Sequence, residues 1–216
     1  MNIVREIKDY GLHLDNCLSQ EDINYILDLC KSKELPTGSS RLGSHIIISF
    51  IDIESSEGIE ISNKIFEKIH PVMVNSMKFY TNHFGLDMNN YVMSKPAYWI
   101  KTYDIGASIG HHTDSWDSED GKVMVPSVSI VLYLSSDFEG GEITFIDEEN
   151  KAEIILQQSL GNSEHKTKTD NDITIKPSAG QVMIFDSNVT HAVKEVIGGK
   201  RISTDITYMN KIPGSI

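Results

Sequence analysis

Short runs of β-branched and aromatic residues, separated by glycine, proline, aspartate and asparagine, dominate the chain from Tyr91 onward. Runs of this kind, bounded by turn-forming residues, predict short strands. The predicted strands cover residues 91–103, 127–135, 142–146, 152–156, 172–175, 181–185, 191–196 and 202–208. A long succession of short strands is typical of a β-sandwich or a β-barrel, so we expect the C-terminal part of the chain to form one.

The strand predicted at residues 127–135 has two chemically different faces. Side chains alternate along a strand, so every second residue shares a face. One face is wholly apolar and carries Val128, Ile130, Leu132 and Leu134. The other face is mixed and carries Ser129, Val131 and Tyr133. We expect the apolar face to pack in a core and the mixed face to line a cavity.

The first helix is predicted from its end signals. Ser19 followed by Asp22 favours a capped start, and apolar residues then recur at helical spacing. Pro36 and Gly38 cannot continue a helix easily, so the helix is expected to end near Glu34.

A second helical pattern runs over residues 59–84. The apolar residues on one side of it are Ile61, Ile65, Ile69, Val72, Met73 and Met77. Pro71 lies inside this pattern and predicts either a kink or the start of a new helix. Residues 45–53, between the two helical patterns, are apolar and β-branched, which predicts a strand.

Charge and cysteine content restrict the partners and the compartment. The formal net charge is −12 and no basic cluster is present, which argues against nucleic acid and anionic membrane as partners. Cys17 and Cys30 are the two cysteines, and so few indicate reduced thiols. The first ten residues lack the apolar run of a signal peptide, and no run approaches the roughly 18 apolar residues of a membrane span. We expect a cytoplasmic protein, and the sequence does not indicate its oligomeric state.

His112-Thr113-Asp114 is the first candidate metal motif. Two residues apart on a strand, His112 and Asp114 point the same way and can bind one metal ion. Imidazole and carboxylate together suit a borderline metal such as iron. Such a pair also arises by chance in solvated loops, so it needs a third ligand. His191, which follows the predicted strand ending at Phe185, is the candidate, and two histidines with one carboxylate would leave positions open for other ligands.

Arg201, ten residues after His191, adds a candidate anion-binding group. A planar guanidinium grips a carboxylate through two parallel hydrogen bonds, which suits a keto acid that also chelates the metal. An ordinary surface arginine is the alternative.

These motifs, in this order, resemble the 2-oxoglutarate/iron(II) oxygenase superfamily, in its prolyl 4-hydroxylase-like branch. The residues that carry the resemblance are Leu18–Asp22, Tyr103–Gly106, His112–Asp114, Val131–Leu134, Phe138–Phe145, Pro177–Gly180, the stretch up to Phe185, His191 and Gly199–Arg201. The likeness therefore spans nearly the whole chain.

The resemblance implies an α+β, mainly β fold: a double-stranded β-helix, or jelly roll, with N-terminal helices packed on one side. Residues 1–216 would form a single domain, with a helical N-terminal support region at 1–87 and the jelly-roll core at 88–216. Two features depart from the pattern. Residues 147–176 are longer than expected and suggest an added hairpin and loop, and Tyr208 stands where a tryptophan is common.

The resemblance also implies the cofactors and the residues that hold the metal. His112, Asp114 and His191 match the iron(II) ligands and so the catalytic centre, with 2-oxoglutarate as co-substrate and dioxygen as oxidant. Ascorbate binding is a further expectation. Halogenating relatives carry a small residue in place of the carboxylate, so Asp114 favours hydroxylation.

Further residues are assigned to the pocket on the same basis. Arg201 matches the residue that binds the distal carboxylate of 2-oxoglutarate. Tyr133 matches a tyrosine that bonds the same carboxylate, and Tyr103 lies where another pocket tyrosine is common; core packing is the alternative for both. Trp116 and Trp99 flank the metal motif and are candidates for stacking on a substrate, with ordinary packing as the alternative.

Three functions are consistent with the sequence. The first is hydroxylation of a prolyl residue in a peptide or protein, and the second is hydroxylation of a free amino acid or small metabolite. The third is a metal-binding jelly-roll protein or a hydrolase, which would need neither 2-oxoglutarate nor dioxygen.

Overall fold

The structure, a computed structural model, describes residues 1–39, 46–49, 53–94, 99–114, 116–117, 123–124, 126–146 and 172–211. The N-terminal elements are β1 (Asn2–Ile7), β2 (Gly11–Asp15), α1 (Gln20–Leu29), β3 (Thr37–Ser39), β4 (Ile46–Ser49) and α2 (Ser56–His83). The next are η1, a short 3-10 helix (Met88–Asn90), β5 (Tyr91–Met93), β6 (Trp99–Tyr103), β7 (Ile109–His112), β8 (Trp116–Asp117), β9 (Val123–Met124) and β10 (Val128–Tyr133). The last are β11 (Phe138–Gly140), β12 (Ile143–Phe145), β13 (Ile173–Ile175), β14 (Val182–Asp186), β15 (His191–Val193), β16 (Val196–Gly199) and β17 (Arg201–Asn210).

Most of the predicted strands are present, with two differences. The strand predicted at 91–103 is divided into β5 and β6, and the one at 191–196 is divided into β15 and β16. The second division has a clear cause, because the chain changes sheets: β15 pairs with β12 and β7, whereas β16 pairs with β11. The strand predicted at 152–156 lies outside the described residues, as does most of the segment predicted as an added hairpin and loop.

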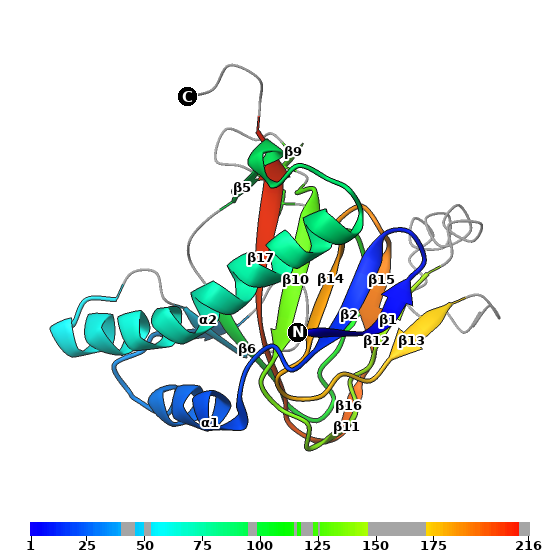
Figure 1. Cartoon of the computed structure of the whole chain (residues 1–216). Coiled ribbons are helices and arrows are strands. Elements are labelled where there is room, and N and C mark those ends of the chain that lie inside the picture. The colour runs from blue at the N-terminus through cyan, green and yellow to red at the C-terminus, as the bar shows by residue number, and fades with distance from the viewer. Residues whose placement is uncertain are drawn as a thin grey trace.

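In the described residues the strands form a nine-stranded main sheet, a four-stranded minor sheet and two ribbons of two strands. The main sheet has the order β1-β2-β14-β10-β17-β6-β4-β3, and β5 also pairs with β17. The minor sheet has the order β13-β12-β15-β7. Every pairing is antiparallel, and β10 is central because it pairs with both β14 and β17. Figure 1 shows α2 crossing the main sheet over β10 and β17.

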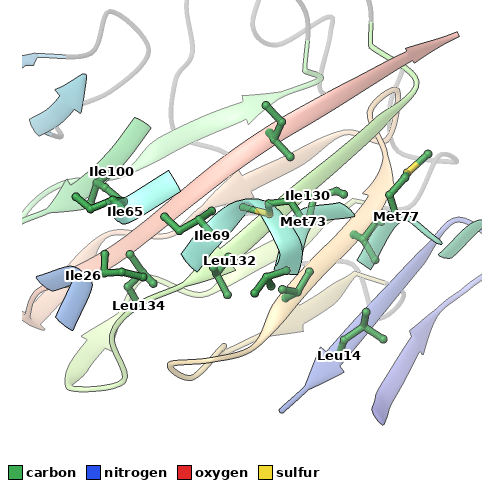
Figure 2. Close-up of a cluster of buried hydrophobic side chains, with 14 of the residues drawn as sticks. Leu14, Ile26, Ile65, Ile69, Met73, Met77, Ile100, Ile130, Leu132 and Leu134 are labelled. Carbon is green, nitrogen blue, oxygen red and sulfur yellow. The ribbon is translucent and has the colours of Figure 1, made fainter. Parts of the chain in front are cut away.

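The apolar face of β10 packs against α2, as its pattern predicts. Figure 2 shows Ile130, Leu132 and Leu134 meeting side chains of α2, among them Ile69 and Met73. All six apolar residues predicted for one side of the second helix are buried. The opposite face of β10 is turned toward the minor sheet, where Ser129 and Val131 line a cavity. One strand thus separates the core from the functional pocket.

Both helices begin with a serine cap. Ser19 accepts a hydrogen bond from the backbone N–H of Asp22, 3.1 Å away, which confirms the predicted start of α1. The helix ends at Leu29, before the predicted end near Glu34, and turns follow it. In α2, Ser55 caps the backbone N–H of Gly58 at 3.0 Å.

Pro71 does not divide the second helical region. α2 continues from Ser56 to His83 with the proline inside it, so the alternative of a new helix at this point is wrong. Pro71 itself is exposed, while the residues around it, such as Ile69 and Met73, are fully buried against the sheet. Tertiary packing therefore offsets the hydrogen bond that proline cannot donate.

The N-terminal region is not only helical, because it also supplies β1 to β4 to the main sheet. β2 pairs with β14, with Leu14 opposite Val182. β1 lies at the sheet edge and is exposed at five of its six positions, so it has no apolar alternation for a sequence pattern to reveal.

The predicted fold class is confirmed: a mainly β jelly roll whose helices lie on one side of the main sheet (Figure 1). In the part of the chain that the structure describes, no helix combines the length and the apolar character needed to cross a membrane.

Candidate metal centre and its pocket

Strand pairing in the minor sheet brings the two predicted histidines together. β15 runs antiparallel to β7, and the register places His191 directly opposite His112. Residues that face each other in this way have Cβ atoms roughly 5 Å apart. The two ring centroids lie 4.3 Å apart. His191 is buried, and its ring packs edge-on against that of Phe185, with the two centroids 4.8 Å apart.

Backbone carbonyls fix the tautomer of both rings. His112 Nδ1 lies 2.8 Å from the carbonyl oxygen of Gly110, and His191 Nδ1 lies 2.9 Å from that of Val189. A carbonyl oxygen only accepts, so each Nδ1 must carry the proton. Each Nε2 is then left with a lone pair, and each lies 3.7 Å from Oδ1 of Asp114.

Asp114 is held from two sides. Its backbone N–H donates to the carbonyl of Ser187 at 3.0 Å. Its Oδ2 accepts a hydrogen bond from the hydroxyl of Ser129 at 2.5 Å, and that hydroxyl also lies 2.7 Å from Oγ of Ser187. One carboxylate oxygen is thus occupied, and Oδ1 is left to face the histidines.

This arrangement can hold one divalent metal ion. The candidate ligand atoms of His112, Asp114 and His191 all lie within 4.8 Å of one another. Two imidazole nitrogens and one carboxylate oxygen suit iron, and each has an outer hydrogen-bond partner of the kind that orients metal ligands. Burial lowers the pKa of His112, and the nearby His191 lowers it further, which favours the neutral form that binds metal.

Arg201 lies on the opposite wall of the same cavity. Its side chain is only 2% exposed. The guanidinium stacks on the ring of Tyr103, 4.5 Å from the centroid, and on that of Tyr133, 5.1 Å from the centroid. Its Nη1 donates to Ser203 at 3.3 Å, while its Nε has no hydrogen-bond partner among the described residues.

The hydroxyl of Tyr133 is also buried without a hydrogen-bond partner in the described part of the chain. Burial raises the pKa of Tyr133, and the charge of Arg201 opposes that rise, so the phenol keeps its proton and can donate. A buried cation beside an unsatisfied phenol is unfavourable unless an anion binds there. The pair is suited to a carboxylate.

Gly140 and Gly141 precede β12, and the position of Gly141 requires a glycine. Its backbone adopts a φ of +65°, which disfavours residues with a side chain, and a Cβ built there would lie 3.0 Å from Cδ of Arg201. A glycine here therefore lets the backbone pass close to the stem of the Arg201 side chain.

The cavity between the two walls has a volume of about 60 Å³. It is lined by the three candidate metal ligands, by Tyr103 and Arg201, and by a second charged pair that the sequence did not predict. In that pair Lys101 Nζ lies 2.8 Å from Oδ1 of Asp205. Burial would lower the pKa of Lys101, but the Asp205 carboxylate, together with smaller contributions from Tyr103 and Asp114, holds the pKa above its usual value. These neighbours favour the cationic form of Lys101 in the pocket.

A protein-family model described as the 2OG-Fe(II) oxygenase superfamily matches residues 98–208, just over half of the 216-residue chain. The chain belongs to this superfamily. Membership makes iron(II) the metal and 2-oxoglutarate the co-substrate of the oxygenase, in agreement with the donor set of the centre. No curated protein matches the sequence significantly.

Solved structures similar to the oxygenase include two prolyl hydroxylases. A prolyl-4-hydroxylase from Pseudomonas putida is 15% identical, with a TM-score of 0.55 and coverage of 94% of this chain and 93% of the other. The viral collagen prolyl hydroxylase of Paramecium Bursaria Chlorella virus-1, in its 2OG complex, is 19% identical, with a TM-score of 0.55 and coverage of 94% and 97%.

HygX from Streptomyces hygroscopicus, with nickel, 2-oxoglutarate and hygromycin B bound, is similar as well. It is 12% identical, with a TM-score of 0.60 and coverage of 94% of this chain and 83% of the other. At these identities the likeness establishes the fold. The family match confirms the superfamily predicted from the motifs, and the fold agrees with the predicted prolyl 4-hydroxylase-like branch.

Trp99, one of the two tryptophans predicted to contact substrate, is not brought together with this centre. Trp99 is 40% exposed at the start of β6 and does not line the cavity. The backbone of Trp116 forms β8, but its side chain lies outside the described residues.

Sequence reasoning missed the groups that support the centre. Ser129 stands on the mixed face of its strand, which was a usable signal. The sequence also contained a signal for Lys101, because this residue shares a strand face with Tyr103. The sequence contained no signal for Ser187, since its role depends on contacts with residues far away in the sequence.

Proposed function

We propose that this oxygenase is a hydroxylase whose iron(II) is held by His112, Asp114 and His191. The observation that carries the proposal is the convergence of two Nε2 atoms and one carboxylate oxygen in a pocket that also holds a buried arginine. An iron ion held by only these three protein ligands would have positions left for 2-oxoglutarate and dioxygen. The carboxylate of Asp114 favours hydroxylation over halogenation, because it occupies the place that a halide would need.

The residues of the pocket bind and orient the co-substrate. Arg201 receives the distal carboxylate of 2-oxoglutarate, and the free hydroxyl of Tyr133 donates a second hydrogen bond to it. Tyr103 stacks on the guanidinium and keeps its plane fixed. The bound iron and 2-oxoglutarate supply the oxidising chemistry, in which one oxygen atom of dioxygen enters the substrate as a hydroxyl group and the other enters succinate as carbon dioxide leaves.

Two substrate classes are candidates. A prolyl residue of a peptide or protein is the first, and it is supported by the fold shared with two prolyl hydroxylases over more than nine-tenths of each chain. A free amino acid or small metabolite is the second. It is supported by the Lys101–Asp205 pair, because an apolar proline ring offers no partner to either charge.

The first test is succinate formation. The purified protein is incubated with iron(II), 2-oxoglutarate, dioxygen and ascorbate, which we propose acts as an accessory reductant, and candidate substrates are analysed by mass spectrometry. Succinate and a product heavier by one oxygen atom are expected. No succinate with any candidate or without one, from protein that binds iron, would reject the proposal.

Two variants test the assigned residues. His191→Ala should lose measurable iron binding, because two donors remain of three. Arg201→Ala should still bind iron but raise the KM for 2-oxoglutarate at least about 30-fold, since the carboxylate loses a buried charged partner. Lys200→Ala is the control, because this neighbouring cation is 65% exposed and should not alter the KM. An unchanged KM in the Arg201 variant would remove this residue from the pocket.

A further inference from the structure

Strand register places Lys101 and Asp205 on the same wall of the pocket as Arg201, the residue proposed to bind the co-substrate, and further along the strands. β17 pairs with β6 so that Arg201 faces Tyr103 and Ser203 faces Lys101. Alternate residues share a face, so Arg201, Ser203 and Asp205 all point into the cavity. At about 3.3 Å per residue, Asp205 lies roughly 13 Å from Arg201 along the strand, and Lys101 lies about half as far. Ser129, which bonds to Asp114 of the metal centre, faces Thr207 two residues further along β17, so the pair lies between Arg201 and the metal centre along the strand.

The pair opens into the cavity rather than onto the outer surface. The Lys101 and Asp205 side chains are 21% and 27% exposed, and both line the space that the metal ligands line. Their neighbours in that wall include apolar side chains such as Val131, which is directly opposite Asp205 in the register. Burying two charges in such a place costs desolvation energy, so a buried ion pair adds little net stability even where each partner keeps the other charged. A ligand that uses both charges accounts for them better than a structural role does.

The charges of the pocket point to the kind of ligand. Among the residues lining it, the cations Arg201 and Lys101 are balanced by the carboxylates Asp114 and Asp205. Arg201 and Asp114 are already assigned to the co-substrate and to the metal. One cation and one anion, 2.8 Å apart, remain for the substrate. A molecule with one positive and one negative group close together is complementary to them.

We infer that Lys101 and Asp205 determine specificity for a free amino acid, with Lys101 binding its α-carboxylate and Asp205 its α-ammonium group. This inference rests on the proposed hydroxylase function and names the substrate class. A prolyl residue inside a peptide carries neither charge, so Lys101 and Asp205 would bond only to each other. Free proline and other free amino acids satisfy both.

The deciding experiment compares charged and blocked forms of the same side chains. Wild-type protein with iron(II), 2-oxoglutarate and dioxygen is given the twenty free L-amino acids, their N-acetyl amides and a proline-containing peptide. At least one free amino acid should raise succinate formation above the substrate-free rate and gain an oxygen atom. Its blocked form should be at least about 10-fold less effective, because two charge-assisted hydrogen bonds are lost.

Variants then connect the specificity to the two residues. Lys101→Met and Asp205→Asn should each raise the KM for the free amino acid about 10- to 100-fold, and Lys101→Arg should recover much of the loss. In the double variant Lys101→Asp/Asp205→Lys the two charges are exchanged. This variant should recover the melting temperature of the wild type but not its KM for the free amino acid. A merely structural pair would regain both. Lys200→Met is the control, because it breaks an exposed ion pair with Asp104 outside the pocket and should leave the KM unchanged.

The outcomes separate this inference from the proposed function. Turnover with the peptide or with blocked amino acids, equal to or above that with free amino acids, overturns the inference and leaves the hydroxylase standing. An unchanged KM in both single variants overturns it as well. No succinate from wild-type protein under any condition overturns both.

Discussion

Single side chains decide how well this centre can bind its metal. The ligand residues stand in motifs that a sequence pattern can reveal, but Asp114 is aimed by Ser129, which comes from another strand. The hydroxyl of Ser129 occupies Oδ2 at 2.5 Å and thereby leaves Oδ1 to face the two histidines. Groups that bond to a metal ligand in this way orient it and tune its affinity.

Ser129→Ala should therefore weaken iron(II) binding by about 10- to 100-fold, because the Asp114 carboxylate becomes free to rotate. Anaerobic titration calorimetry measures the affinity. The control is Ser127→Ala, just before β10, which removes a hydroxyl that accepts a hydrogen bond from the backbone N–H of Asn210 at the end of β17. Equal affinities in both variants would show that Ser129 does not position the carboxylate.

At the level of helices and strands, the α2–β10 contact is the main support of the pocket. β10 carries the core on one face and the cavity on the other, so the helix that packs on it also holds the pocket wall in place (Figure 2). The amphipathic pattern of α2 identified its buried face correctly, but not the strand that covers it. The pattern did not show that Pro71 would be accommodated inside a continuous helix.

Ile69→Ala should lower the free energy of unfolding by about 2–5 kcal/mol, because the side chain is fully buried and its removal leaves a cavity. Urea unfolding followed by circular dichroism gives the value. Ile59→Ala in the same helix is the matched control, since that side chain is 49% exposed and its loss should cost less than about 0.5 kcal/mol. Comparable losses in the two variants would contradict the assigned packing.

The N-terminal strands join the same sheet as the strands of the jelly roll, and this bears on the folding of the complete chain. β2 pairs with β14, and its His13 donates to the amide oxygen of Gln181 at 2.8 Å. We propose that residues 1–216 form one domain on this basis. Pairing across such a sequence distance makes the N-terminal segment part of the β core as well as its support.

His13 should make the stability of the metal-free protein depend on pH. Burial lowers the pKa of His13 below its ordinary value of 6.5, against the smaller opposing effects of Gln181 and Asp15. The unfolded chain then binds more protons than the folded one below this pH. The stabilisation that comes from neutral His13 is complete above about pH 6.5. Below this pH the free energy of unfolding should fall, by at most about 1.4 kcal/mol per pH unit for one proton.

Urea unfolding at a series of pH values from about 7.5 to 5 measures the free energy of unfolding across the range in which histidine titrates. The lowered pKa of His112 acts in the same direction, so part of the slope should persist in any His13 variant. His13→Gln should give a shallower slope, because glutamine can bond to Gln181 without titrating. A slope identical to that of wild type would exclude His13 as a source.

Local patterns in the sequence indicated a strand-rich fold with two helices and the candidate metal ligands His112 and Asp114. Strand alternation, helical spacing and the His112-x-Asp114 motif act over a few residues, so a pattern can detect them. The order of the motifs along the chain added His191 and Arg201.

Only the tertiary structure decided what lies beside these groups. His191 meets His112 through the register of β15 on β7, and Lys101 meets Asp205 through the register of β6 on β17. The exposed edge strand β1 and the support of Asp114 by Ser129 and Ser187 likewise depend on long-range pairing. Register is set by the packing of complete sheets, and a one-residue shift would turn every side chain to the opposite face, so no local pattern contains it.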